Sequence, residues 1–210
     1  MTIFVKKKVM KKIEAYARLN GNREVGGLIL GTKDKEGNIT VKDAIPMEQY
    51  GKDVHFEITD KAMMDFTKNA SAKAISSVLG WWHSHHSFST FWSFDDNRCF
   101  ERLCNLSNFC LGVVVAFKGK NEITSRWKLD IKNKDNERIS IDNIKPEILL
   151  PIRRFYIDID RIKDDLANFV KYDNREWIIC NHCNGTGQIE VKPDVRLCTD
   201  DKMLYGEYIG

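Results

Sequence analysis

The sequence has few cysteines, no secretory leader and no long apolar run. The N-terminal stretch reads MTIFVKKKVMKKIEAYARL and lacks the continuous apolar segment of a signal peptide. Without such a signal, the 6 cysteines indicate reduced thiols or metal ligands rather than a disulfide framework. No apolar run approaches the roughly 20 residues that a membrane-spanning helix needs. We therefore expect a cytoplasmic protein without a membrane partner.

The sequence also has little net charge. Lysine and arginine number 33 against 30 aspartates and glutamates, and a formal net charge of +3 argues against nucleic acid as a partner. A hydrophobic content of 42% with 30% charged residues is typical of soluble globular proteins. A length of 210 residues fits one medium domain with a small appendage, and such a chain can bury a substantial core.

Hydrophobic periodicity predicts alternating helices and strands. Apolar residues recur at helical spacing in four segments, residues 5–19, 60–78, 95–106 and 158–171. Short apolar or alternating runs predict strands at residues 25–31, 39–47, 54–59, 78–83, 111–117 and 122–131. In the last of these, Trp127 and Leu129 share one side with Ile131, as in a half-buried strand. The expected fold class is α/β (α+β), with a mixed central sheet flanked by helices.

Composition predicts three parts along the chain. Residues 1–131 contain all the expected strands and form the main domain. Residues 132–147 are polar and charged, so we interpret 132–174 as a linker or insertion followed by an amphipathic helix. Residues 175–210 differ in composition and form a small cysteine-containing module.

The most informative stretch covers residues 80–96 and reads GWWHSHHSFSTFWSFDD. His83 and His85 end an apolar strand, where alternation puts both side chains on one side, within reach of one ion. Asp95 or Asp96 can add a carboxylate at the start of the next helix. Three protein ligands with an open fourth position define a catalytic zinc site, where bound water has a pKa of about 7. Ser93 is a candidate hydrogen-bond donor to an oxyanion.

This stretch resembles the signature of the JAMM metalloproteases, the zinc-binding members of the MPN (JAB) family. Their pattern is His-x-His-x7-Ser-x2-Asp, and here it runs from His83 through Ser93 to Asp96. The family also places an essential glutamate upstream, in a strand near the first helix. Glu24, in the segment REVGGLILG, matches that place. The resemblance covers roughly residues 5–131.

The resemblance implies a cytidine-deaminase-like fold and a role for each matched residue. His83, His85 and Asp96 would bind zinc, and the spacing selects Asp96 over its neighbour. Glu24 would act as general acid/base, and Ser93 would donate a hydrogen bond to the tetrahedral intermediate. The implied activity is that of a zinc-dependent peptidase or isopeptidase, deubiquitinase-like, acting on the C-terminal tail of a ubiquitin-like protein or its conjugate.

Two alternatives stay open beside the enzyme. One is a non-catalytic MPN scaffold that binds a partner, and the other is an adaptor acting through the C-terminal module. His86 stands where many family members have proline, and we interpret it as a polar loop residue. The compact chain with a histidine in place of that proline resembles prokaryotic or phage-encoded members. Cys99, Cys104 and Cys110 lack Cys-x-x-Cys spacing and are expected to be buried as small apolar residues.

The C-terminal module carries a second metal motif. Its sequence CNHCNGTG, which begins with Cys180 and includes Cys183, resembles one Cys-x-x-Cys-x-Gly-x-Gly knuckle of the DnaJ-type zinc-binding domain. A closed zinc site needs four ligands, and Cys198 is the obvious third. His182, Asp200 or a second subunit could supply the last, and a shared knuckle would give a homodimer. A structural zinc is favoured over a redox pair or a degenerate knuckle, because it would help a small module to fold.

Overall fold

The chain forms two compact units, Met1–Tyr172 and Asp173–Gly210. The computed structural model describes residues 1–21, 23–52, 55–85, 89–118, 122–151, 155–172, 177–179 and 188–190. In the second unit these residues form one antiparallel pair, β12 (Trp177–Ile179) with β13 (Gln188–Glu190). Cys180, Cys183, Cys198 and His86 lie outside the described residues, so the zinc knuckle and the role of His86 stay predictions.

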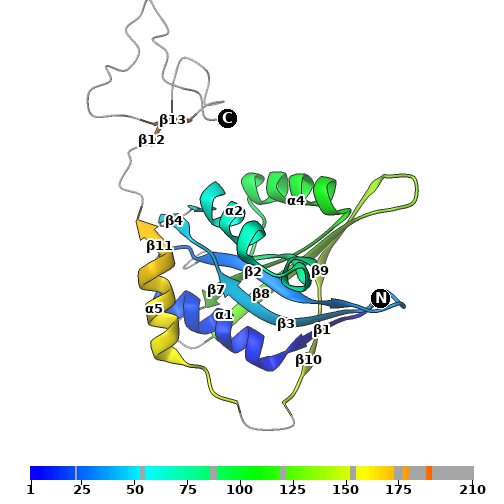
Figure 1. Cartoon of the computed structure of the whole chain (residues 1–210), viewed down its shortest axis with the longest axis horizontal. Helices are drawn as coiled ribbons and strands as arrows, with labels where there is room; N and C mark the ends of the chain where they lie inside the picture. The colour runs from blue at the N-terminus through cyan, green and yellow to red at the C-terminus, as the bar shows by residue number, and fades with distance from the viewer. Residues whose placement is uncertain are drawn as a thin grey trace, which may run out of the picture. The chain divides into compact units, whose positions relative to one another are not determined.

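The first unit is built on a curled mixed sheet, with strands in the order β10-β1-β3-β2-β6-β7-β8-β9 (Figure 1). These strands are β1 (Ile3–Lys6), β2 (Gly26–Lys33), β3 (Ile39–Pro46), β6 (Val78–His85), β7 (Phe109–Lys118), β8 (Glu122–Lys132), β9 (Arg138–Ile144) and β10 (Glu147–Leu149). A smaller sheet has the order β11-β4-β5, with β4 (Gln49–Lys52), β5 (His55–Ile58) and β11 (Val170–Tyr172). The predicted mixed α/β fold class is confirmed.

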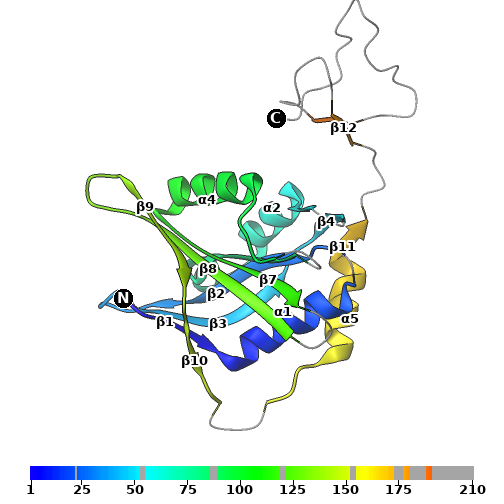
Figure 2. The same ribbon diagram turned by 180° about the vertical axis from the view of Figure 1, so that it is seen from behind.

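Helices cover both faces of the large sheet, as seen from opposite sides in Figures 1 and 2. On one face lie α1 (Lys7–Leu19) and α5 (Ile159–Phe169), and on the other α2 (Asp60–Asn69) and α4 (Phe94–Ser107), with the short α3 (Ala72–Ser76) before β6. Within the described part of the chain, no helix is both long and apolar enough to cross a membrane.

The central strand β6 is buried on both of its faces. Trp82 belongs to the large core under α1, where its ring lies 5.7 Å from that of Tyr16. Trp81 points the other way and packs against Phe100 of α4, with ring centroids 5.7 Å apart. The alternation of β6 therefore assigns its odd-numbered residues, which include both histidines of the motif, to the α4 side.

Gly80 allows the close approach of β6 to β7, and replacing it should destabilise the fold. A Cβ atom there would lie 1.8 Å from the carbonyl oxygen of Leu111, and φ is +151°. We expect Gly80→Ala to lower the free energy of unfolding by about 3 kcal/mol or more. Gly37→Ala is the control, because Gly37 also has positive φ (+84°) but its Cβ would meet only open space near Lys33; it should cost about 1–2 kcal/mol. Urea unfolding followed by tryptophan fluorescence measures both, and equal losses would contradict the steric argument.

Several single elements differ from the sequence expectations. Residues 132–147, interpreted as a linker or insertion, carry β9 and the turn before β10, and the first compact unit runs on to Tyr172. The first helix begins at Lys7 because Ile3–Lys6 pair with β3 and β10 as a strand. The helix expected at 60–78 is broken, since α2 ends at Asn69 and Ser71 caps α3.

Strand β8 was also expected to be half-buried, and its middle is buried on both sides. Trp127 and Leu129 face the large core as predicted. Lys128 is buried as well. Its ammonium donates to Asn97 Oδ1 (2.6 Å) and lies over the ring of Phe100. Asp130 is buried with an ion pair to Arg138. Alternation alone could not show that α4 covers the second face.

Candidate metal centre

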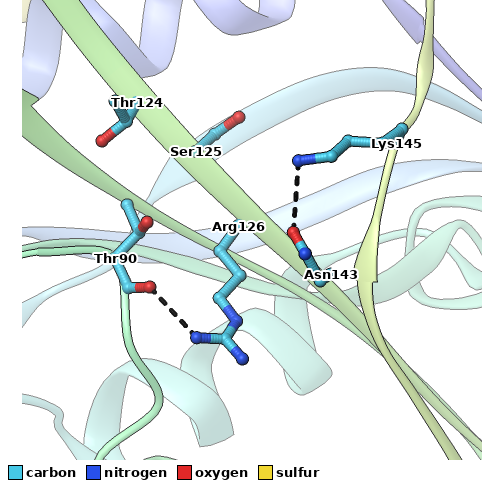
Figure 3. A pocket seen from close by; sticks show the side chains of 6 residues that line it. All are labelled: Thr90, Thr124, Ser125, Arg126, Asn143 and Lys145. Carbon is cyan, nitrogen blue, oxygen red and sulfur yellow. Dashed lines mark hydrogen bonds between the residues drawn. The ribbon is translucent and has the colours of Figure 1, made fainter.

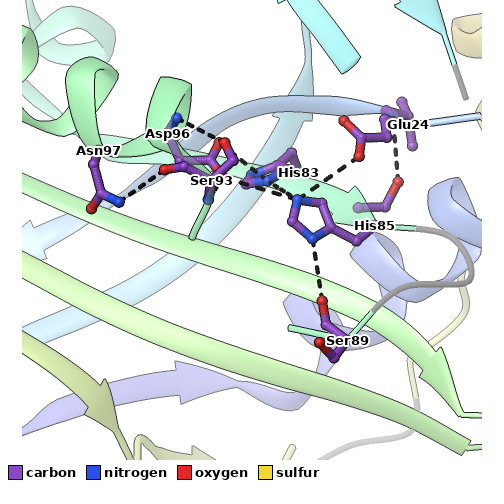
Figure 4. A network of polar contacts seen from close by, with 9 residues as sticks. Glu24, His83, His85, Ser89, Ser93, Asp96 and Asn97 are labelled. Atoms are coloured by element: carbon purple, nitrogen blue, oxygen red, sulfur yellow. Dashed lines mark hydrogen bonds and ion pairs between the residues drawn. The ribbon is translucent and has the colours of Figure 1, made fainter. Parts of the chain in front are cut away.

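Strand β6 delivers two histidines to one point. Side chains at His83 and His85 project to the α4 side, and their Nε2 atoms lie 2.9 Å apart (Figure 4). Both are almost fully buried, with 1% and 4% of their surface exposed. The ring of His83 stacks on Trp81, with centroids 4.6 Å apart and planes 9° from parallel. His85 Nδ1 lies 3.3 Å from the carbonyl oxygen of Ser89. Because a carbonyl oxygen can only accept a hydrogen bond, Nδ1 carries the ring hydrogen and Nε2 presents its lone pair.

The first turn of α4 brings a carboxylate to the same point. Ser93 is the N-cap: its Oγ accepts from the Asp96 amide (3.0 Å), and Asp96 Oδ2 accepts from the Ser93 amide (2.7 Å). This reciprocal capping box holds the carboxylate against the helix terminus. Asp96 Oδ1 then lies 3.4 Å from His83 Nε2, and Oδ2 lies 3.9 Å from His85 Nε2. Asp95, which chemistry alone could not distinguish from Asp96 as the ligand, is exposed.

The three side chains fit a zinc ion. One ligand atom from each of His83, His85 and Asp96 lies within 4.8 Å of the others, and all three residues are buried. Imidazole nitrogen and carboxylate oxygen bind zinc at about 2.0–2.2 Å, so tetrahedral ligand atoms lie about 3.4 Å apart. The two histidine Nε2 atoms lie 2.9 Å apart and Asp96 Oδ1 lies 3.4 Å from His83 Nε2, both near that value. Among the described residues, this is the cluster of histidine, cysteine and acidic side chains that could hold a metal.

Glu24 approaches the same nitrogen of His85 as Asp96 does. Its Oε1 atom is 3.8 Å from His85 Nε2, and only 5% of the residue is exposed. Ser84 holds the adjoining backbone: its Oγ accepts from the Val25 amide (3.0 Å), and its own amide donates to the Val25 carbonyl (2.9 Å). The carbonyl of Glu24 accepts from the side-chain amide of Asn20 at 3.2 Å.

The environment separates the pKa values of the two carboxyl groups. Burial, and secondly the negative charge of Asp96, raise the pKa of Glu24 to about 8. Burial also acts to raise the pKa of Asp96, but the hydrogen bond and charge of His83 and the bonds from Ser93 outweigh it and lower that pKa to about 2. Asp96 is thus an ionised group suited to a cation, and Glu24 can carry a proton near neutral pH.

Gln49 supports the start of β2 and was not found by sequence reasoning. Its buried side-chain amide accepts from the Gly26 amide and donates to the carbonyls of Gly26 and Met47, each at 2.8 Å. The chain is thereby fixed two residues after Glu24. A buried glutamine leaves little signal in sequence, because glutamine is common on surfaces.

A second unforeseen group holds the loop between the histidines and Ser93. Asp142 of β9 accepts from Trp92 Nε1 (3.0 Å) and forms a two-pronged ion pair with Arg126 of β8 (3.0 and 2.6 Å). Arg126 also donates to the carbonyl of Thr90 at 3.4 Å. Asp142 therefore ties the loop to two strands, although the sequence placed it in a linker.

Comparison with known proteins identifies the family. Residues 6–130 match the family model of prokaryotic homologs of the JAB domain, which is more than half of the chain. The chain belongs to the JAB family. The predicted JAB (MPN) membership is therefore confirmed, and the matched JAB region contains Glu24, Ser93 and the three candidate ligands. It ends before β9, so Asp142 lies outside it.

Curated relatives of this JAB chain include two yeast proteins. The 26S proteasome regulatory subunit RPN11 of Candida glabrata is 31% identical over 127 residues, 57% of this chain and 41% of the relative. The ubiquitin carboxyl-terminal hydrolase RPN11 of Saccharomyces cerevisiae is 29% identical over the same shares. The chain thus spans about two fifths of the length of these relatives. The solution structure of a Desulfitobacterium hafniense protein has 22% identity and a TM-score of 0.47, covering 71% of this chain and 93% of that one.

Proposed function

We propose that this JAB domain is a zinc-dependent metallopeptidase or isopeptidase of the JAMM type. Its substrate would be the C-terminal tail of a ubiquitin-like protein or its conjugate. One observation carries the proposal: two buried histidines and an ionised aspartate converge on one point, with a protonatable glutamate 3.8 Å from the second histidine. The name of one relative, ubiquitin carboxyl-terminal hydrolase, supports this substrate class.

Each of the matched residues has a chemical task in this reaction. His83, His85 and Asp96 would hold zinc, which when bound supplies Lewis acidity that activates water and polarises a carbonyl. Glu24 takes the proton of the attacking water and passes it to the amine that leaves, since an unprotonated amine is a poor leaving group. Its raised pKa suits both transfers.

Ser93 has a structural and a chemical task. Its Oγ accepts the amide hydrogen of Asp96, which keeps the carboxylate at the centre. The hydroxyl retains its own hydrogen, which can be donated to a carbonyl oxygen as negative charge develops there. One side chain therefore orients a ligand and supports the transition state.

The alternative function is a non-catalytic scaffold that binds a partner. A scaffold uses the fold and surface, and has no need for two buried carboxyl groups with separated pKa values. The C-terminal module would carry a structural zinc on Cys180, Cys183 and Cys198 in either case. The cytoplasmic location and a homodimer stay predictions.

Metal removal separates enzyme from scaffold. Linear fusions and lysine-linked conjugates of ubiquitin-like proteins are incubated with the full chain before and after dialysis against a chelator, and cleavage is followed on gels. We expect cleavage to be lost without metal and restored by zinc, because the three ligands have no catalytic action alone. Cleavage that survives complete metal removal would overturn the proposal. The proposal would also be overturned if no substrate of the panel were cleaved and a partner bound equally well with and without metal. That result is expected of a scaffold.

A further inference from the structure

A polar cavity of about 440 Å³ lies beside the loop that follows β6 (Figure 3). Its lining comes from that loop, from β8, from the end of β9 and from the residue after it: Thr90, Thr124, Ser125, Arg126, Asn143 and Lys145. Hydroxyl, amide and cationic groups face the cavity, and no carboxylate of the described residues is among them. This chemistry suits an anionic ligand.

The strand register places Thr124, one wall of the cavity, on the same face of the sheet as the metal centre. His85 pairs with Ala116 of β7, and Ala116 pairs with Thr124 of β8. Paired residues share a face of the sheet, and neighbouring strands lie about 4.8 Å apart, so the two steps to Thr124 span about 10 Å. Lys145 follows β9, which pairs with β8, so it lies one strand further, at about 15 Å. An extended peptide covers about 10–15 Å in about three to five residues.

The cationic character of the cavity comes mainly from Lys145. The guanidinium of Arg126 is already paired with the carboxylate of Asp142. Lys145 Nζ instead donates to the neutral Oδ1 of Asn143, at 3.2 Å. Its charge is thus available to a ligand, and Thr90 adds a hydroxyl on the opposite wall of the cavity.

We propose that this cavity binds a carboxylate side chain of the substrate, an aspartate or glutamate about three to five residues from the scissile bond. The inference rests on the proposed peptidase function and adds a specificity determinant to it. Lys145 supplies the charge, and the neutral groups of the lining supply hydrogen bonds. Like Asp142, Lys145 lies beyond the family match at residues 6–130.

The test uses a set of fluorogenic peptides built on a ubiquitin-like tail and extended past the scissile bond. Glutamate and glutamine are compared at each position on both sides, and kcat/KM is measured with zinc-loaded full chain. We expect the wild type to prefer glutamate at one position, about three to five residues from the scissile bond, on one side. Lys145→Gln should lower this preference by roughly 3- to 10-fold, as for one partly exposed charged contact. Lys145→Glu should reverse the preference, so that glutamine is favoured over glutamate at that position.

Lys35→Gln is the matched control, because it removes the same charge from the exposed turn after β2. It should leave the preference for glutamate unchanged. A wild type without any preference, or a preference that survives Lys145→Gln, would overturn the inference while leaving the peptidase proposal intact.

Binding provides a readout that does not depend on turnover. Fluorescein-labelled versions of the glutamate and glutamine peptides are titrated into the Glu24→Gln variant, and anisotropy reports the two dissociation constants. Tighter binding of the glutamate peptide, lost on adding Lys145→Gln, supports the cavity even if no peptide in the set is cleaved. Equal binding of both peptides contradicts it. Absence of cleavage with wild type counts against the peptidase proposal alone.

Discussion

Replacing Glu24 by glutamine is expected to lower the rate of hydrolysis by roughly 10²–10⁴-fold, the usual contribution of a general acid–base group. The amide has nearly the size of the carboxyl group, so the buried position beside His85 stays filled. It cannot accept a proton from water or give one to the leaving amine. The loss should appear in kcat with little change in KM, because proton transfer takes place in the transition state.

Zinc content separates this effect from damage to the site. The Glu24→Gln variant should hold as much zinc as the wild type, because Glu24 is not among the three candidate ligands. Glu36→Gln is the matched control: Glu36 lies in the exposed turn between β2 and β3, and the variant should keep full activity. A Glu24→Gln chain that cleaves at the wild-type rate would show that the proton is carried by another group.

Replacing both His83 and His85 by alanine is expected to remove one zinc per chain. The double variant leaves Asp96 as a single ligand in the centre, and one carboxylate does not retain zinc. Elemental analysis of wild type and variant, purified side by side, measures the change. Zinc that persists in the variant would belong to the cysteines of the C-terminal module. Hydrolysis should be lost together with the central zinc.

Two comparisons guard this experiment against a folding artefact. His55→Ala, in β5 of the smaller sheet, removes a histidine that does not belong to the His-x-His motif and should keep the full zinc content. Circular dichroism and urea unfolding should show that the double variant is folded, although it loses the stacking of His83 on Trp81. If a folded double variant holds the same zinc as the wild type, the cluster is not a metal site and the scaffold becomes the better explanation.

The parts of the fold that bury apolar side chains were predictable from sequence. The runs that became β2, β6 and β7 are continuous apolar segments, because helices cover both faces of the sheet there. Strand β9 was not predictable, since most of its residues are exposed and it is held by backbone pairing with β8. Backbone hydrogen bonds do not require particular side chains, so the sequence of β9, RISIDNI, can have the composition of a linker.

The same division applies to the candidate site. The spacing of His83 and His85 predicts convergence because alternation in a strand fixes side-chain direction. The place of Glu24 came from family resemblance, because its approach to His85 depends on β2 and β6 pairing. Asp142 and Lys145 approach the site through β9, and no local pattern in the sequence marks them.

The continuity of β9 and β10 limits how the length of this segment can change. β9 pairs with β8 at one edge of the large sheet, and two residues later β10 pairs with β1 at the other edge. An inserted or deleted residue would shift one of these registers, and a shift by one residue turns side chains to the opposite face. If the register of β9 shifts, Asp142 would leave Arg126 and Trp92. Surface loops usually tolerate insertions and deletions. Although this segment has the composition of a linker, it should accept substitutions far more readily than insertions or deletions.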